Sequence, residues 1–205
     1  MAVISNGTTL ADAGAMSGLG SLTLIKTITV SSGTSTVSFV DGTSSVVLDN
    51  TYPIYKFEFI NIHASNNTTH FSFQANVAGG SGFDETITST YFRAFHGENG
   101  VDTGLGYDGN RDLGQATGFQ ELISGIGNDT DGNGNGELFL FNPSSTTFVT
   151  HFMATTVTSY ADEAARRMHV AGYINTTAAI DEIQFKQSAG NIDSGIIKLY
   201  GIKDS

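Results

Sequence analysis

Residues 55–62 read Tyr-Lys-Phe-Glu-Phe-Ile-Asn-Ile, and this stretch decides the class of fold. Its aromatic residues recur at every second position and lie on one face of an extended chain, while its two isoleucines lie on the other face. Because both faces are partly apolar, the stretch predicts a central β-strand.

The rest of the chain repeats this pattern in short segments rich in Thr, Val, Ile and Phe, separated by turns. The 205 residues include 25 Gly but 2 Pro, which favours many strands joined by many turns. The spacing predicts about ten strands, as in a sandwich. We therefore predict an all-β fold, a single antiparallel β-sandwich of jelly-roll-like architecture.

The first segment of the chain, residues 1–21, is small, Gly-rich and nearly uncharged. We predict that it forms an extended N-terminal arm and that residues 22–205 form the β-sandwich domain. The alternative for the arm is a disordered tail. Apolar side chains favour an arm that becomes ordered on a neighbouring subunit. These side chains are Val3, Ile4, Leu10, Met16 and Leu19.

The composition points to protein partners. Charged residues make up 14% of the chain, below the usual quarter, so a surface of Ser, Thr, Asn and Gly would repel neighbouring subunits weakly. The net charge is −11 and the basic residues form no cluster beyond Arg166-Arg167, which argues against direct nucleic-acid binding. The absence of cysteine excludes disulfides and thiolate metal sites. Neither a membrane-spanning segment nor a secretory signal is predicted.

One acidic segment begins like a calcium-binding loop. Oxygen ligands would come from Asp129, Asp131 and Asn133, but the position of the closing glutamate is Leu140, so an EF-hand is rejected. A looser Ca²⁺ site made by Asp129, Asp131 and Glu137 remains an alternative to an acidic surface turn. No other cofactor is expected.

Two pairs of histidines could meet across paired strands and bind a metal, namely His63 with His70 and His151 with His169. The alternative is that each imidazole forms ordinary hydrogen bonds.

The G-x-G-x-x-G match at residues 104–109 has no predicted helix after it and is not a dinucleotide site. Nothing resembles a nucleophile elbow, and adjacent carboxylates point to opposite faces of a strand. We therefore expect no enzyme.

Two Gly-rich stretches, residues 97–118 and 125–136, are the longest predicted loops, and loops of this length are commonly functional. A host-contact or glycan site would need an exposed aromatic ring beside convergent Asp and Asn side chains. The first loop offers such a candidate set, which comprises Tyr107, Asp108, Asn110 and Asp112.

Three stretches carry the most specific sequence pattern of the chain. They are residues 55–63, Leu-Phe-Leu-Phe-Asn-Pro at 138–143, and the closing run 179–202, which ends in Gly-Ile-Ile-Lys-Leu-Tyr-Gly-Ile. Their combination resembles a family of virion structural proteins of tailed bacteriophages, especially marine ones. The resemblance covers most of the chain from about residue 51, and its C-terminal ending is the most specific part. It implies a β-rich protein attached to the head or tail, without catalytic residues.

Two functions are expected on this basis. The first is a capsid decoration or cement protein that forms a homo-oligomer, with a trimer expected, binds the major capsid protein and bridges capsomers. The second is a tail component, such as a fibre, ring or receptor-binding module, that contacts tail proteins or a host glycan. In both cases the protein would be made in the host cytoplasm and located in the virion.

Overall fold

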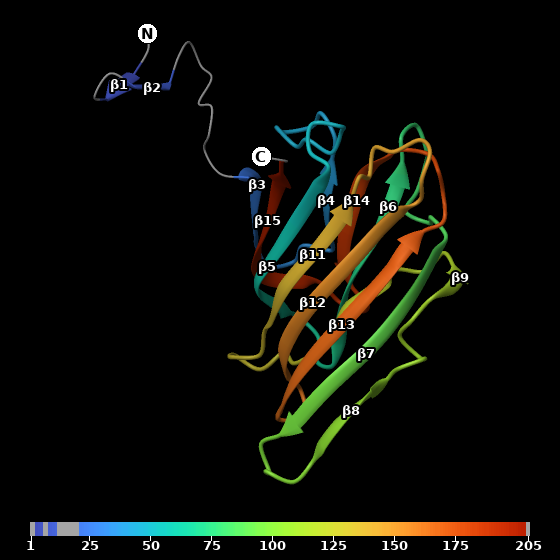
Figure 1. Ribbon diagram of the computed structural model, residues 1–205. Coiled ribbons are helices and arrows are strands. Elements are labelled where there is room, and N and C mark those ends of the chain that lie inside the picture. Colours follow the sequence, from blue (N-terminus) through green and yellow to red (C-terminus); the bar gives the residue numbers. More distant parts are fainter. Residues whose placement is uncertain (1–2, 6–7, 12–20, 204–205) are drawn as a thin grey trace.

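The computed structural model describes residues 3–5, 8–11 and 21–203, and none of these residues is helical (Figure 1). The predicted all-β class is therefore confirmed. The strands are β1 (Val3–Ser5), β2 (Thr8–Ala11), β3 (Leu22–Val30), β4 (Thr36–Val40), β5 (Ile54–Ala64), β6 (Thr69–Val77), β7 (Ile87–Gly97), β8 (Thr103–Tyr107), β9 (Gly114–Ala116), β10 (Gln120–Ile126), β11 (Gly134–Phe141), β12 (Thr150–Tyr160), β13 (Ala164–Ile174), β14 (Ile180–Gln187) and β15 (Ile192–Ile202). Among the described residues there is accordingly no helix with the length and apolar character needed to cross a membrane.

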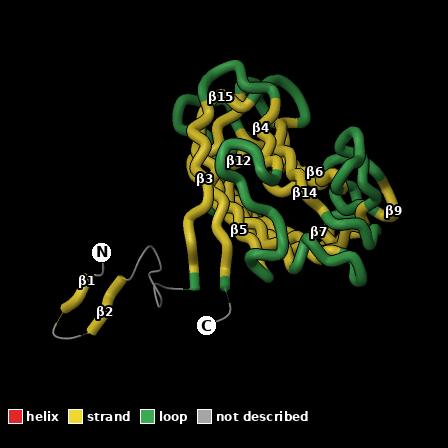
Figure 2. Tube along the Cα trace, turned by 90° about the horizontal axis from the view of Figure 1, so that it is seen from above, coloured by secondary structure: helices red, strands yellow, loops and turns green. Residues whose placement is uncertain are grey.

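Strands β3 to β15 form one antiparallel sheet of thirteen strands, and β1 and β2 pair in a separate sheet. One series of neighbours runs β3-β15-β5-β11-β12-β13-β7, with β8 and β9 beside β7. A second series, β10-β6-β14-β4, joins the first through the pairing of Ile126 with Tyr160. The sheet therefore curls until it nearly closes, with loops at its ends (Figure 2).

The sequence pattern underestimated the number of strands in two regions. The predicted loop 97–118 contains β8 and β9, because residues 103–107 pair with the C-terminal half of β7. Residues 120–123 belong to β10, which pairs with β6. Residues 162–167 form a turn followed by the start of β13. In each case pairing with a distant strand determines the local conformation.

The stretch that decided the fold forms β5, which lies between β15 and β11 as a central strand. Its aromatic side chains are buried as predicted, but the placement of Ile62 opposite them is wrong. Asn61 adopts a left-handed backbone conformation with a φ of 51°, and the register with β15 shifts nearby. Its backbone N–H donates to Asn135 Oδ1 at 2.8 Å. This bulge turns Ile62 back into the core.

The core fills the space between the two series of strands. Phe185 on β14 lies with its ring centre 5.1 Å from that of Phe57 and 5.2 Å from that of Phe59, both on β5. It also stacks on Phe71 of β6 at 5.5 Å. All four rings are buried. Aromatic packing therefore fixes the second series of strands against the inner side of the first.

The C-terminal strand is tied into the sheet on both edges. Residues of β15 pair with β5 on one side and with β3 on the other. The strand begins at Ile192, before the closing Gly-Ile-Ile-Lys-Leu-Tyr-Gly-Ile run. Gly195, with a φ of 137°, lies where the pairing with β5 shifts rather than at the beginning of the strand.

Candidate functional site

The predicted host-contact residues lie on β8 and in the turn after it. Tyr107 is 60% exposed, and its hydroxyl donates to the carboxylate of Asp112. Asp108 is buried, and its carboxylate forms ion pairs with Arg93 at 3.0 Å and Arg111 at 3.2 Å. Asp108 therefore anchors the loop, whereas the tyrosine ring faces solvent.

A network of polar side chains holds this loop against the sheet. Asn110 is exposed in the turn, and the next residue, Arg111, donates from Nη1 to Glu121 Oε2 at 2.5 Å. The same guanidinium lies 3.3 Å from His70 Nε2. On the other side of the imidazole, the backbone N–H of Gly125 donates to His70 Nδ1 at 2.9 Å. The network thus connects the loop to β6 and β10.

This contact makes His70 a source of pH-dependent stability. Burial lowers the pKa of His70 below its ordinary value of 6.5; Glu121 opposes this effect, while Arg111 and Arg166 add to it. The folded chain therefore keeps the imidazole neutral at a pH where the unfolded chain takes up a proton. We expect the free energy of unfolding to fall as the pH drops below 6.5, until the lowered pKa is reached.

The His70→Gln variant is expected to lose this part of the pH dependence, which for one proton is at most about 1.4 kcal/mol per pH unit. Glutamine cannot titrate, but its amide oxygen can still accept the N–H of Gly125. Urea unfolding at a series of pH values measures the slope for both proteins. Identical slopes would contradict the assignment.

The candidate calcium ligands are only partly brought together. Asp129 and Asp131 lie in the loop before β11 and line the same cavity. Glu137 lies on β11, where its carboxylate binds Lys56 Nζ at 3.0 Å, and it lines a different groove. Within residues 3–5, 8–11 and 21–203, no group of three or more His, Asp or Glu side chains is arranged to hold a metal ion.

The candidate histidine pairs do not form in the structure. His63 lies 3.5 Å from the carboxylate of Asp193, whereas His70 belongs to the network described above. His151 and His169 lie on neighbouring strands, β12 and β13, and both point to the outside of the sheet. They are not opposite each other, because Tyr173 faces the first and Thr155 faces the second.

The two long loops meet at one end of the molecule, beside the turn between β12 and β13. One cavity there is lined by Glu98 from the first loop, Asp129 and Asp131 from the second, and Glu163 from the turn. The backbone N–H of Glu98 donates to the carbonyl oxygen of Glu163 at 2.8 Å, which joins the first loop to the turn. This end of the molecule is strongly acidic.

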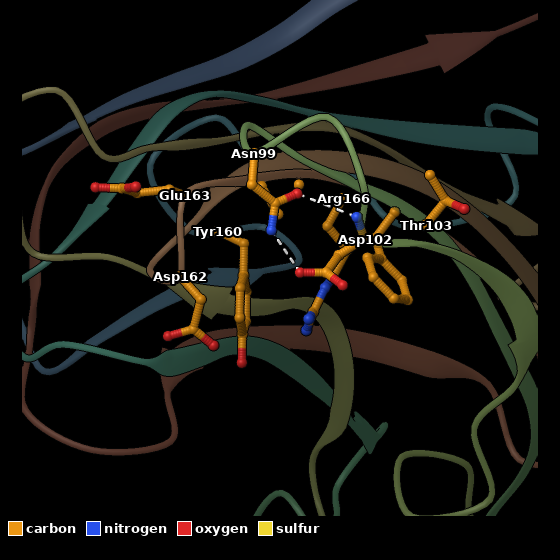
Figure 3. A pocket seen from close by; sticks show the side chains of 10 residues that line it. Asn99, Asp102, Thr103, Tyr160, Asp162, Glu163 and Arg166 are labelled. Atoms are coloured by element: carbon orange, nitrogen blue, oxygen red, sulfur yellow. Dashed lines mark hydrogen bonds between the residues drawn. The ribbon is translucent and has the colours of Figure 1, made fainter.

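A neighbouring cavity at this acidic end is shown in Figure 3. Carboxylates of Asp102 and Asp162 line it, and the Asn99 amide donates to Asp102 and accepts the backbone N–H of the same residue. Deeper in the wall, the buried guanidinium of Arg166 stacks on Tyr160, 3.4 Å from the ring centre. The cavity therefore combines polar loop groups with a rigid stacked pair.

An apolar surface covers the solvent side of β5, β11, β12, β13, β7 and β8, and we call it the outer face. The six strands that contribute to it lie side by side in Figure 1. Their pairing register arranges the outward side chains in rows. The three central rows are Leu105, Ala94, Arg167 and Val157; Tyr107, Phe92, His169 and Thr155; and Thr90, Ala171, Met153 and Phe139.

Large apolar side chains on the outer face are exposed to an extent that is uncommon in isolated domains. The exposed fractions are 78% for Leu105, 55% for Met153, 46% for Val157 and 43% for Phe92. Beside them, a groove is lined mainly by apolar side chains, among them Ile54, Phe139, Phe141, Met153 and Ile202. Large exposed apolar side chains grouped on one face in this way are typical of a protein–protein contact surface.

The outer face also departs from the charge of the whole chain. The outward positions of its six strands carry two acidic residues, Glu58 and Glu137, and two basic residues, Lys56 and Arg167. The chain as a whole has 20 acidic and 9 basic residues. Lys56 lies 3.0 Å from both carboxylates. The face is therefore close to neutral on an acidic molecule.

The candidate arm is described in part. Val3 and Ile4 belong to β1 and Leu10 belongs to β2, whose backbones pair antiparallel. Met16 and Leu19 lie outside the described residues.

Comparison with known proteins found no matching family model, curated protein or solved structure. The outer face was not among the predicted sites. A signal for it exists in residues 151–157, His-Phe-Met-Ala-Thr-Thr-Val, where apolar side chains occur on both sides of the strand. In the structure, Met153 and Val157 lie on the side of this strand that faces solvent.

Proposed function

We propose that this chain is a non-enzymatic structural protein of a bacteriophage virion, and that it decorates the capsid. The observation that carries the proposal is the outer face, an apolar and nearly neutral surface several strands wide. Burying such a surface against another protein is favourable, because apolar area leaves water and few charges lose their hydration. The resemblance of residues 55–63 and 179–202 to phage virion proteins supports the same role.

The proposed fold within this role is a jelly-roll-like sandwich, with the series β10-β6-β14-β4 as one layer and the longer series as the other. This arrangement leaves the solvent side of the longer layer free for contacts with other subunits. Homo-oligomers and the major capsid protein are the proposed partners, and multiple weak contacts would provide the affinity.

Ser32, Asp193 and His63 resemble a catalytic triad, but their order does not fit one, and this supports the non-enzymatic role. Ser32 Oγ donates to Asp193 Oδ1 at 2.6 Å, and His63 Nδ1 faces Asp193 Oδ2 at 3.5 Å. In a serine hydrolase the hydroxyl would donate to the imidazole, with the carboxylate behind it. Here the carboxylate lies between the serine and the histidine, so the histidine cannot act as base for this hydroxyl.

The alternative role is a tail component. It is favoured by the acidic end, where both long loops contribute to adjacent cavities and Asp, Glu and Asn side chains offer acceptors for sugar hydroxyls. A ligand there would meet residues 98–103 of the first loop and residues 127–132 of the second, rather than the candidate set at the other end of β8.

Immunogold labelling of purified virions with antibody against this chain tests the proposal. We expect gold particles spread over the head. Label confined to the tail would replace the decoration role with the tail role, and complete absence of label from intact and disrupted virions would exclude both.

A further inference from the structure

We propose that the outer face is a self-association surface, on which two copies of this chain pack face to face about a two-fold axis. The inference deepens the proposed function and rests on it, since it names the partner that covers the outer face. It differs from the sequence-based expectation of a trimer, because a contact between two identical faces generates a pair.

The shape of the outer face is complementary to itself. On one side, Phe92, Leu105 and Tyr107 of β7 and β8 form an exposed apolar ridge. On the other side, β5, β11 and β12 carry the apolar groove that contains Phe139 and Met153. Strand β13 lies between the two sides. A two-fold axis that lies in the plane of the face and is inclined to the strands places each ridge over the groove of the partner, so both contacts form twice.

The area of the face is sufficient for a stable pair. Six strands spaced about 4.8 Å apart, with a mean length of roughly nine residues, give a footprint of roughly 800 Å² per copy. A standard stable interface also buries about 800 Å² on each partner. Sheets that pack face to face at about 10 Å separation bury side chains of the size present here.

Charge favours a second copy as the occupant. Two molecules of net charge −11 repel each other over most of their surfaces. The outer face is the exception described above, because its two carboxylates are matched by Lys56 and Arg167. Two such faces can approach without burying an excess of negative charge.

Sedimentation velocity of the full chain, with matched charge substitutions, tests this proposal. We expect a dimer for the wild type and a monomer for Leu105→Glu on the ridge and for Met153→Lys in the groove, with association weakened about 100-fold by a buried charge. Val101→Glu is the control, because Val101 is also 78% exposed but lies in the turn between β7 and β8. It is expected to remain dimeric.

A mixture of the two face variants provides a second measurement. In the mixed pair, one ridge–groove contact is unaltered, and the other contains the introduced carboxylate on the ridge and the introduced ammonium group in the groove. Because these charges have opposite sign, we expect dimers to return. Circular dichroism and thermal unfolding verify that each variant is folded.

Three results would overturn the inference, namely a monomeric wild type, a trimer, or a dimer that survives both substitutions. Each of these results leaves the labelling of virions unaffected, so failure here is distinguishable from failure of the proposed function.

Discussion

The Phe185→Ala variant is expected to lose about 3–5 kcal/mol of unfolding free energy. Phe185 is fully buried, and its ring touches aromatic rings from both series of strands, including Phe57 and Phe71. Truncation leaves a cavity between the two series of strands, which cannot collapse without moving β14 relative to β5. The lost aromatic contacts add to the cost of the cavity.

Urea or guanidinium unfolding followed by circular dichroism measures this effect. The matched control is Phe148→Ala, because Phe148 is 70% exposed and its truncation is expected to change stability by less than about 0.5 kcal/mol. A loss below about 1 kcal/mol at Phe185 would mean that the two series of strands do not depend on this ring for their packing.

The Gly136→Ala variant is expected to be destabilised by about 3 kcal/mol, from the combination of backbone strain and overpacking. Gly136 lies in β11 between two neighbouring strands, with a φ of 152°. A methyl group there would lie 2.7 Å from the Cα of Thr156 and would also collide with the carbonyl oxygen of Thr155. Both neighbours are backbone atoms of β12, so a side-chain rotation cannot relieve the clash.

Gly106→Ala is the control for this substitution. Gly106 lies in β8, and a methyl group there would have no neighbouring atom within 4 Å. Its stability is expected to stay within about 0.5 kcal/mol of the wild type. Thermal unfolding of the two variants side by side gives the comparison, and equal midpoints would refute the crowding at Gly136.

The sequence was sufficient for the class of fold and for the strands that lie in the middle of the sheet. Alternation at residues 55–59 identifies the inner side of β5, and alternation at 196–202 identifies the last strand. These segments have strong apolar patterns, and burial of such a pattern is a local requirement that any fold must satisfy. Segments without it, such as 103–107, were assigned to loops because two of their five residues are glycine.

The candidate sites were less predictable than the fold. Asp108 and Tyr107 are adjacent in the sequence, yet one is a buried ion-pair partner and the other is exposed. The difference depends on Arg93 and Arg111, whose positions relative to Asp108 are set by pairing and by the turn. Similarly, the shift of Ile62 into the core depends on a bulge held by a side chain of β11, far along the chain.

The sequence by itself determined an all-β chain with an aromatic core, a low density of charge and an acidic balance, because composition and alternation are properties of the chain alone. Tertiary structure decided which strands became neighbours, and hence that Leu105, Val157 and Met153 share one surface. It also decided that loops 97–118 and 125–136 meet at one end. The physical reason is that alternation separates the two sides of a strand, whereas the partners across the sheet depend on contacts between residues distant in sequence.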